Sequence, residues 1–272
     1  MGGSVPAARL RRPATTGLVW RQLDHWRIRW RRTWRGSAIT NFVLPILYLL
    51  AMGVGLGAYV DEGGGRAALG GVDYLEFIAP GLLATSVMQN AVGASTWPVM
   101  GAIKWDKTYF AMIASPLRTR DVLVGNLGFV AARLALTAAV FWLVLALFGV
   151  VVLPWAVLAV PAGVLVGMAH ATPLFALSAR LERETGFMLV YRVGVVPMFL
   201  FSGAFFPVSQ LPDPVQWLAQ SLPLYHGVEL VRGLTLGRPD LLADIGHVAY
   251  LVLWCGVGFV LADRALARRL GG

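Results

Sequence analysis

Long apolar stretches alternate with short polar or basic segments from about residue 37 to the end of the chain. Each stretch has about 20 residues, which is enough for a helix to cross a hydrocarbon core about 30 Å thick. Six stretches are expected to span the membrane, at about residues 38–60, 77–99, 133–153, 156–178, 186–206 and 246–264. The pattern predicts an all-α integral membrane protein with six transmembrane helices in a domain covering residues 37–272.

The chain before the first apolar stretch divides into two parts. Residues 1–17 contain Gly, Ala, Pro and Arg without an apolar period, and we expect a disordered tail. Residues 18–36 have helical spacing, with an apolar face opposite a basic one: Leu23, Trp26, Trp30 and Trp34 against Arg21, Arg31, Arg32 and Arg35. Such an amphipathic helix lies in the plane of the membrane interface. It could be a lipid anchor alone, or a connecting helix that also contacts a cytoplasmic partner.

A second amphipathic segment follows the second apolar stretch. Residues 104–115 are expected to form a cytoplasmic helix that stops before Pro116. Its apolar face contains Trp105, Tyr109, Met112 and Ile113, and its polar positions are Lys104, Asp106 and Lys107. The alternative is a simple interfacial tether between two spans.

The segment at about residues 205–233 is too polar to cross a bilayer and too apolar for a solvated loop. Four prolines interrupt it: Pro207, Pro212, Pro214 and Pro223. Its large apolar residues include Phe205, Phe206, Leu211, Trp217 and Leu222. We expect an external re-entrant segment made of short broken helices. Glu229 and Arg232, three residues apart, either fasten its far end or form a solvated surface pair.

The second apolar stretch is unusually polar for a helix that faces lipid. Its polar side chains must find partners in protein or water, and they include Thr85, Ser86, Gln89 and Asn90. They could bond between helices or line a translocation route, and these two interpretations are compatible. Arg133 is placed at the start of the third span, where an arginine can extend towards the headgroups.

Charge is sparse but strongly asymmetric. Charged residues make up 14% of the chain, against about 25% in soluble domains. Of the 23 Lys and Arg residues, 19 precede the first span, lie in connections on the same side, or follow the last span. The net charge of +9 therefore fits the positive-inside rule and anionic lipid, not nucleic acid. Both termini are expected in the cytoplasm.

The chain contains no motif that would supply energy or catalysis. A P-loop requires a lysine after a glycine, whereas Lys104 and Lys107, the only lysines, follow Ile103 and Asp106. With Cys255 as the single cysteine and no HExxH or GxSxG motif, we expect no catalytic residue, metal or cofactor in this chain. A chain that moves a substrate would then take energy from a partner.

Two motifs show a family resemblance that covers nearly the whole chain after residue 20. One is KWDKTYFAMIASPLRTRDVLVGNL, and the other is FSGAFFPVSQLPDPVQWLAQSLPLYHGVELVRGLTLG. Both are similar to segments of ABC-2 type transporter permeases, with the closest likeness to the NodJ-type branch of lipo-oligosaccharide and drug exporters. The chain is identified on this basis as the membrane-spanning subunit of an ATP-binding cassette exporter.

The resemblance implies partners and residue roles. Two permease copies, most simply a homodimer, pair with two P-loop ATPase subunits that bind ATP and Mg. The ATPase-coupling helix corresponds to residues 104–115, with Lys104, Trp105, Asp106, Tyr109 and Met112. The connecting helix would use Trp26, Trp30, Arg31 and Trp34, and the exit gate Phe205, Phe206, Leu211, Trp217, Leu222, Glu229 and Arg232. Asp106 stands where such permeases often have a glutamate, a departure that affects the expected ATPase contact.

The resemblance also implies a bacterial cytoplasmic membrane and an amphiphilic substrate, which would be a glycolipid, a lipo-oligosaccharide or a hydrophobic drug. The alternatives are a membrane enzyme that modifies lipids or glycans, and a non-catalytic membrane scaffold. An enzyme would need a catalytic cluster, for which His226 and Glu229 are the nearest candidates.

Overall fold

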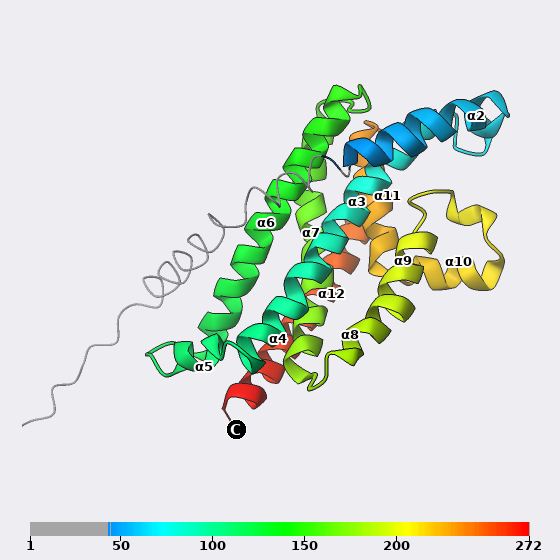
Figure 1. Ribbon diagram of the computed structural model, residues 1–272. Helices are drawn as coiled ribbons and strands as arrows, with labels where there is room; N and C mark the ends of the chain where they lie inside the picture. Colours follow the sequence, from blue (N-terminus) through cyan, green and yellow to red (C-terminus); the bar gives the residue numbers. More distant parts are fainter. Residues whose placement is uncertain (1–42, 44, 272) are drawn as a thin grey trace, which may run out of the picture.

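The computed structural model describes residue 43 and residues 45–271. The predicted tail, the amphipathic helix at residues 18–36 with Trp26, Trp30, Arg31 and Trp34, and the start of the first span lie outside these residues. Helices and turns make up the described part of the chain, which contains no strand. The all-α prediction is therefore confirmed for this part (Figure 1).

The helices follow one another in a simple order. The first half comprises η1 (Leu49–Leu56), α2 (Gly57–Glu62), η2 (Gly65–Ala67), α3 (Tyr74–Ser95), α4 (Trp97–Lys104), α5 (Thr108–Ile113) and α6 (Thr119–Leu147). The second half comprises η3 (Trp155–Leu158), α7 (Ala159–Arg180), α8 (Thr185–Leu189), η4 (Val190–Val195), α9 (Val196–Phe201), η5 (Val208–Gln210), α10 (Asp213–Gln220), α11 (Pro223–Thr235) and α12 (Leu241–Leu270).

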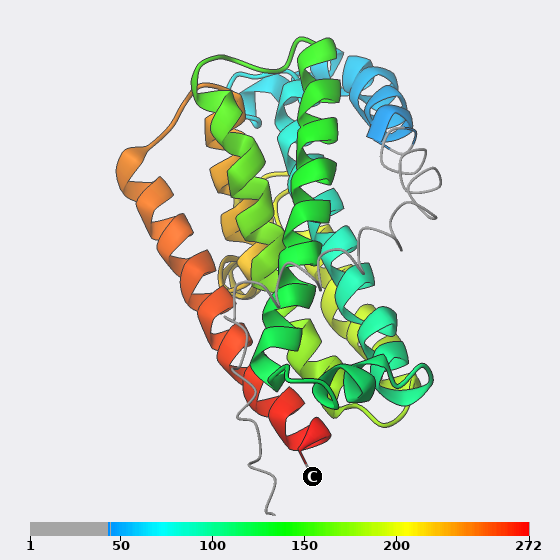
Figure 2. The same ribbon diagram turned by 90° about the vertical axis from the view of Figure 1, so that its left-hand side faces the viewer.

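Helix α7 forms the centre of the bundle and packs against α3, α6, α11 and α12 (Figures 1 and 2). Small residues make this packing possible. A Cβ atom on Gly167 would lie 2.6 Å from Leu134 of α6 and 2.8 Å from Val87 of α3. Gly258 of α12 approaches Thr172 of α7 in the same way. Close approach of backbones at small residues is typical of packing between membrane helices.

The number of spans is established only in part. Within the described residues, three helical stretches are long and apolar enough to cross a membrane: Thr119–Leu147, Trp155–Arg180 and Leu241–Leu270. The stretch Thr185–Phe201 is apolar but shorter. Helix α3 has the length but also contains several polar side chains. The count of six spans remains a prediction.

The third predicted span was misplaced. Residues 133–153 were expected, but α6 begins fourteen residues earlier, at Thr119, and ends at Leu147. The polar residues at its start do not interrupt it, because Asp121 accepts a hydrogen bond from the Arg118 backbone and Asn126 is buried against Tyr109. Arg133 therefore lies at the midpoint of α6 and not near a helix end.

The two ends of the bundle differ in charge. Helix α5, the connection from α7 to α8 and the C-terminal end of α12 lie together at one end, which we call the α5 end (Figures 1 and 2). Ion pairs link these segments: Arg269 lies 3.7 Å from Glu182, and Lys104 lies 3.9 Å from Glu184. The predicted basic side of the protein, as far as it is described, corresponds to this end.

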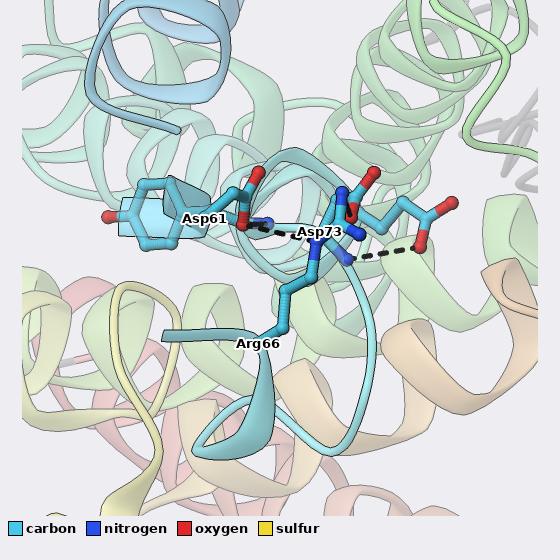
Figure 3. Close-up of polar contacts among 5 residues, drawn as sticks. Asp61, Arg66 and Asp73 are labelled. Carbon is cyan, nitrogen blue, oxygen red and sulfur yellow. Dashed lines mark hydrogen bonds and ion pairs between the residues drawn. The ribbon is translucent and has the colours of Figure 1, made fainter. Parts of the chain in front are cut away.

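The connection from α2 to α3 lies at the opposite end and is fastened by charge. Arg66 contacts Asp73 at 2.5 Å and Asp61 at 4.0 Å, so one guanidinium bridges both ends of the connection (Figure 3). Asp61 also accepts a hydrogen bond from the backbone of Tyr74 at 3.1 Å. The side chain of Arg66 is more than half exposed, so these contacts order the loop more than they stabilise the fold.

The segment predicted as short broken helices contains η5, α10 and α11. Its prolines stand where helices begin: Pro207 before η5, Pro212 and Pro214 at the start of α10, and Pro223 as the first residue of α11. Proline is tolerated there because the first N–H groups of a helix have no partner within it. Helix α11 packs inward against α3 and α7, whereas α10 lies at the surface.

Candidate functional site

The predicted coupling helix is shorter than expected. Helix α4 ends at Lys104, and the chain turns through Trp105, Asp106 and Lys107 before α5 starts at Thr108. Lys107, directly before α5, has a left-handed backbone with φ of 49°, which is uncommon for a non-glycine residue. The predicted helix over residues 104–115 is therefore a tight turn followed by a helix of six residues.

Tyr109 does not belong to a surface of α5. Its side chain is fully buried, its ring stacks on Phe175 of α7 at 6.4 Å, and its hydroxyl accepts a hydrogen bond from Asn126 of α6 at 2.9 Å. Sequence reasoning grouped Tyr109 with Trp105 as a docking residue, and the structure corrects this. Helical spacing identified the apolar face of the segment, but it could not show that this face contacts the protein itself.

The outer surface of the turn and of α5 contains other residues. Trp105 is 51% exposed and Phe110 is 39% exposed. Lys104, Asp106 and Lys107 are also exposed, whereas Met112 is half-buried. Phe110 was not predicted, because in the expected helix it fell outside the apolar face. The structure thus presents two exposed aromatic side chains beside three charged ones.

Arg232 fastens the broken segment to the bundle. Its Nη1 donates to Glu229 at 2.6 Å, its Nη2 donates to the Gly203 carbonyl at 2.6 Å, and its Nε donates to the Phe77 carbonyl at 3.2 Å. The guanidinium also lies 4.0 Å from the centre of the Phe77 ring. With Arg232 12% exposed and Glu229 35% exposed, this is not a solvated surface pair. It joins α11, α3 and the loop after α9.

The apolar residues predicted for an exit gate do not form one group. Phe205 packs edge-on against Phe199 of α9 at 5.0 Å, and Phe206 and Leu222 are half-buried. Trp217 on α10 is 76% exposed, so it does not pack into a lid within this chain. Leu211 is half-buried directly after η5.

Two histidines connect α11 to α12. His226 Nδ1 lies 2.8 Å from His247 Nδ1, and the His226 ring stacks on Tyr250 at 4.0 Å. Burial, and then the nearby His247, lower the pKa of His226. Glu229 pairs with Arg232 instead of His226. The described residues include no group of three His, Cys, Asp or Glu side chains that could hold a metal ion.

A cavity of about 400 Å³ with one polar wall lies beside α3. It brings together the four residues predicted to line a route, Thr85, Ser86, Gln89 and Asn90, with Arg133 and Thr137 of α6. Thr85 and Asn90 donate hydrogen bonds to carbonyls within α3, at 3.1 Å and 3.0 Å, and not to another helix. The sequence interpretation missed Arg133 because it placed this residue at the end of a span.

These features define a class and then a family. The long apolar helices packed through small residues make the chain a helical membrane protein. Residues 16–236 match the ABC-2 type transporter family, so the chain belongs to that family.

Named relatives cover nearly the whole chain. It is 32% identical over 253 residues to nodulation protein J of Rhizobium leguminosarum bv. trifolii, covering 93% of this chain and 92% of the relative. The bv. viciae protein of the same name is 31% identical over 258 residues, covering 93% and 96%. The inner membrane transport permease YadH of Escherichia coli strain K12 is 24% identical over 249 residues, covering 87% and 91%.

Proposed function

We propose that this chain is the permease subunit of an ATP-binding cassette exporter in the bacterial inner membrane. One observation supports the proposal above all others: the family match over residues 16–236 includes both the α4–α5 turn and the broken segment. The exported substrate would be an amphiphile, and a separate P-loop ATPase subunit would hydrolyse ATP. A second copy of the chain would complete the pathway, and the α5 end would face the cytoplasm.

The α4–α5 turn is the proposed contact with the ATPase. Trp105 and Phe110 offer exposed aromatic area, which is enriched at the centres of protein interfaces. Lys104, Asp106 and Lys107 surround it with charge. Tyr109 and Asn126 join α5 to α6 by a hydrogen bond. A displacement of the turn by the ATPase would therefore be transmitted directly to α6, a long helix of the bundle.

The broken segment is the proposed exit gate on the opposite side of the membrane. Arg232 holds α11 against α3, so a movement of α3 would be transmitted to the gate through the Phe77 carbonyl. The exposed Trp217 and the neighbouring Leu218 would contact the second copy or the membrane interface, where aromatic side chains are favoured.

ATP hydrolysis and lipid movement test this function together. The purified chain alone should not hydrolyse ATP, and proteoliposomes that also contain a P-loop ATPase subunit from the same organism should move a fluorescent glycolipid only when ATP is present. The double variant Trp105→Ala/Phe110→Ala should still hydrolyse ATP with its partner but transport at least about tenfold less, as expected for loss of two interface aromatics.

Leu147→Ala is the matched control, since it removes an exposed apolar side chain at the other end of α6. Unchanged transport by the double variant would refute the assignment of the turn. Absence of ATP-driven movement for every lipid tested with the wild-type pair would refute the exporter proposal itself.

Cysteine labelling tests the orientation. Asp213→Cys on α10 should react with an impermeant maleimide in intact cells, and Thr119→Cys at the start of α6 should react only after the cells are opened. Labelling of Thr119→Cys in intact cells would reverse the proposed orientation.

A further inference from the structure

The cavity beside α3 has two chemically different walls. Leu82, Phe141 and Phe199 line it with apolar surface. Its polar wall consists of hydroxyl and amide groups and one cation, from Thr85, Ser86, Gln89, Asn90, Thr137 and Arg133. A volume of about 400 Å³ lies within the range of small-molecule sites, roughly 300–1,000 Å³. The cavity therefore fits a ligand with a polar head and an apolar body.

Arg133 is half-buried and lies at the middle of a long helix. It is fourteen residues from either end of α6, which corresponds to about 21 Å at 1.5 Å per residue. The hydrocarbon core of a bilayer extends only about 15 Å to either side of its midplane. An arginine at the centre of a spanning helix is costly unless it faces water, a cavity or an opposite charge, so its presence there indicates a binding or transport role.

No acid in the described part of the chain neutralises Arg133. The ion pairs of these residues involve Arg66, Lys104, Arg232 and Arg269, and the lining of the cavity contains neither Asp nor Glu. The neighbouring cavity of about 460 Å³ shares Gln89 and Gly93 with this one, includes Arg192, and also has no acid in its lining. The region thus has positive charge without a counter-ion of its own.

We propose that the cavity binds the oxyanion head of an amphiphile, a phosphate, sulfate or carboxylate, with Arg133 as its principal ligand. The planar guanidinium can donate two parallel hydrogen bonds to two oxygens of such a group. The hydroxyl and amide groups of Ser86, Gln89 and Asn90 can donate to the remaining oxygens. Leu82, Phe141 and Phe199 would contact the apolar body. This rests on the proposed function only in taking the amphiphile as the exported substrate.

Two sources can supply this head group: an exchangeable substrate and a resident membrane lipid. Both would present the same oxyanion group to Arg133, but they differ in how readily they leave the cavity. A substrate must leave the cavity, whereas a structural lipid remains through purification and resists displacement. The experiment therefore includes one arm for binding and one arm for exchange.

Calorimetric titration of the full-length chain in maltoside micelles measures binding without any ATPase. The probes are dihexanoyl phosphatidic acid, dihexanoyl phosphatidylcholine and inorganic phosphate. Phosphatidic acid has a terminal phosphate, whereas the phosphate of phosphatidylcholine is esterified by the choline cation and has one free oxygen fewer. The wild type should therefore bind phosphatidic acid at least about tenfold more tightly, because one hydrogen bond to a charged group contributes more than the 1.4 kcal/mol of a tenfold change. Arg133→Gln should abolish this preference, and Arg133→Lys should retain part of it.

Two further variants keep the result interpretable. Asn90→Asp is nearly isosteric and supplies an internal counter-ion, so it should weaken phosphatidic acid binding about tenfold even if Arg133→Gln does not fold. Arg180→Gln removes an exposed charge at the end of α7 and should bind like the wild type. Equal affinity of the wild type and a folded Arg133→Gln or Asn90→Asp variant would refute the site. If Arg180→Gln lost as much affinity for phosphatidic acid as Arg133→Gln, the binding would depend only on the overall positive charge. That result would also refute the site.

The exchange arm uses mass spectrometry of lipids that remain bound to the purified chain. Phosphatidylglycerol that is retained in a manner dependent on Arg133, and displaced by phosphatidic acid, supports an exchangeable site. Retained lipid that phosphatidic acid does not displace supports the oxyanion site but identifies its occupant as a membrane lipid. Competition by inorganic phosphate alone, without phosphatidic acid binding, refutes an amphiphile site. The binding and exchange experiments need no ATPase. A negative result in them would refute the oxyanion site without refuting the exporter proposal, and a negative result in ATP-driven transport would not affect the evidence for the oxyanion site.

Discussion

Two arginines of this chain lie in opposite environments. Arg232 in the broken segment donates to Glu229 and to two backbone carbonyls, and its guanidinium lies over the Phe77 ring. Arg133 at the midpoint of α6 has no acid beside it in the described structure and faces a cavity. Sequence alone placed Arg133 at the start of a span and left open whether Arg232 fastens the broken segment or forms a solvated surface pair with Glu229.

The difference between them separates a structural charge from a functional one. A buried cation whose hydrogen bonds are all used holds elements in place, and losing it leaves its partners unpaired. A cation that faces a cavity and has no acid beside it fastens no elements together and is available to a ligand. Replacing Arg232 should therefore lower the stability of the fold. Replacing Arg133 should weaken ligand binding and leave the stability nearly unchanged.

Replacing Arg232 should have the largest effect on stability. Arg232→Met leaves Glu229 and the carbonyls of Phe77 and Gly203 without their donor, so the free energy of unfolding should fall by about 3 kcal/mol or more. Chemical unfolding of the purified chain in detergent measures this loss. Arg238→Met, an exposed arginine six residues away, should change it by less than about 0.5 kcal/mol. Equal effects of the two variants would show that the network contributes no stability.

Replacing Glu229 should have a smaller effect. In Glu229→Gln, Arg232 keeps both carbonyls and the Phe77 ring but loses its charged partner, so the loss should be about 2 kcal/mol. A double-mutant cycle with Arg232→Met measures how strongly the two side chains depend on each other. Additive losses would contradict a direct interaction.

The buried hydroxyl of Tyr109 makes a hydrogen bond between uncharged groups, which can be compared with the charged contacts of Arg232. Tyr109→Phe removes the acceptor for Asn126 while keeping the ring that stacks on Phe175, so the expected loss is about 1 kcal/mol. The same unfolding assay applies, with the exposed Tyr59→Phe as control. If instead Tyr109→Phe folds normally but uncouples ATP hydrolysis from transport, Tyr109 takes part in docking after all.

Arg133 should show the smallest effect on stability. Arg133→Gln breaks no ion pair between described residues, so the free energy of unfolding without ligand should change by less than about 0.5 kcal/mol, even though oxyanion binding is lost. A loss comparable to that of Arg232→Met would mean that Arg133 has a structural partner, and it would remove the distinction between the two arginines.

Some local features were correctly predicted because they depend on nearby residues. The four prolines of the broken segment predicted where its helices would be interrupted, and three short helices are found there. The distribution of basic residues predicted that three separate segments share one side, and ion pairs of Lys104 with Glu184 and of Arg269 with Glu182 join those segments at the α5 end. These predictions succeeded because proline limits the backbone locally and because charge separation requires only the order of segments along the chain.

The errors came from features that depend on contacts between helices. Tyr109 has the spacing of an exposed anchor, but Asn126 and Phe175 enclose it from two other helices. The start of α6 contains charged residues that hydropathy excludes from a span, so Arg133 was displaced by half a helix. Periodicity identifies an apolar face but does not identify what covers that face.

The sequence by itself determined the class of this protein, its family and the approximate positions of its helices. The length of the apolar stretches, the positions of the prolines and the order of the charged segments can be read directly from the sequence. Each of them influences the structure independently of how the helices pack. The tertiary structure decided which polar groups have partners. Arg232 finds the Phe77 carbonyl 155 residues away, and Arg133 meets α3 across a cavity. Such pairings depend on how the helices pack, because burial makes a hydrogen bond valuable and an unpaired charge costly.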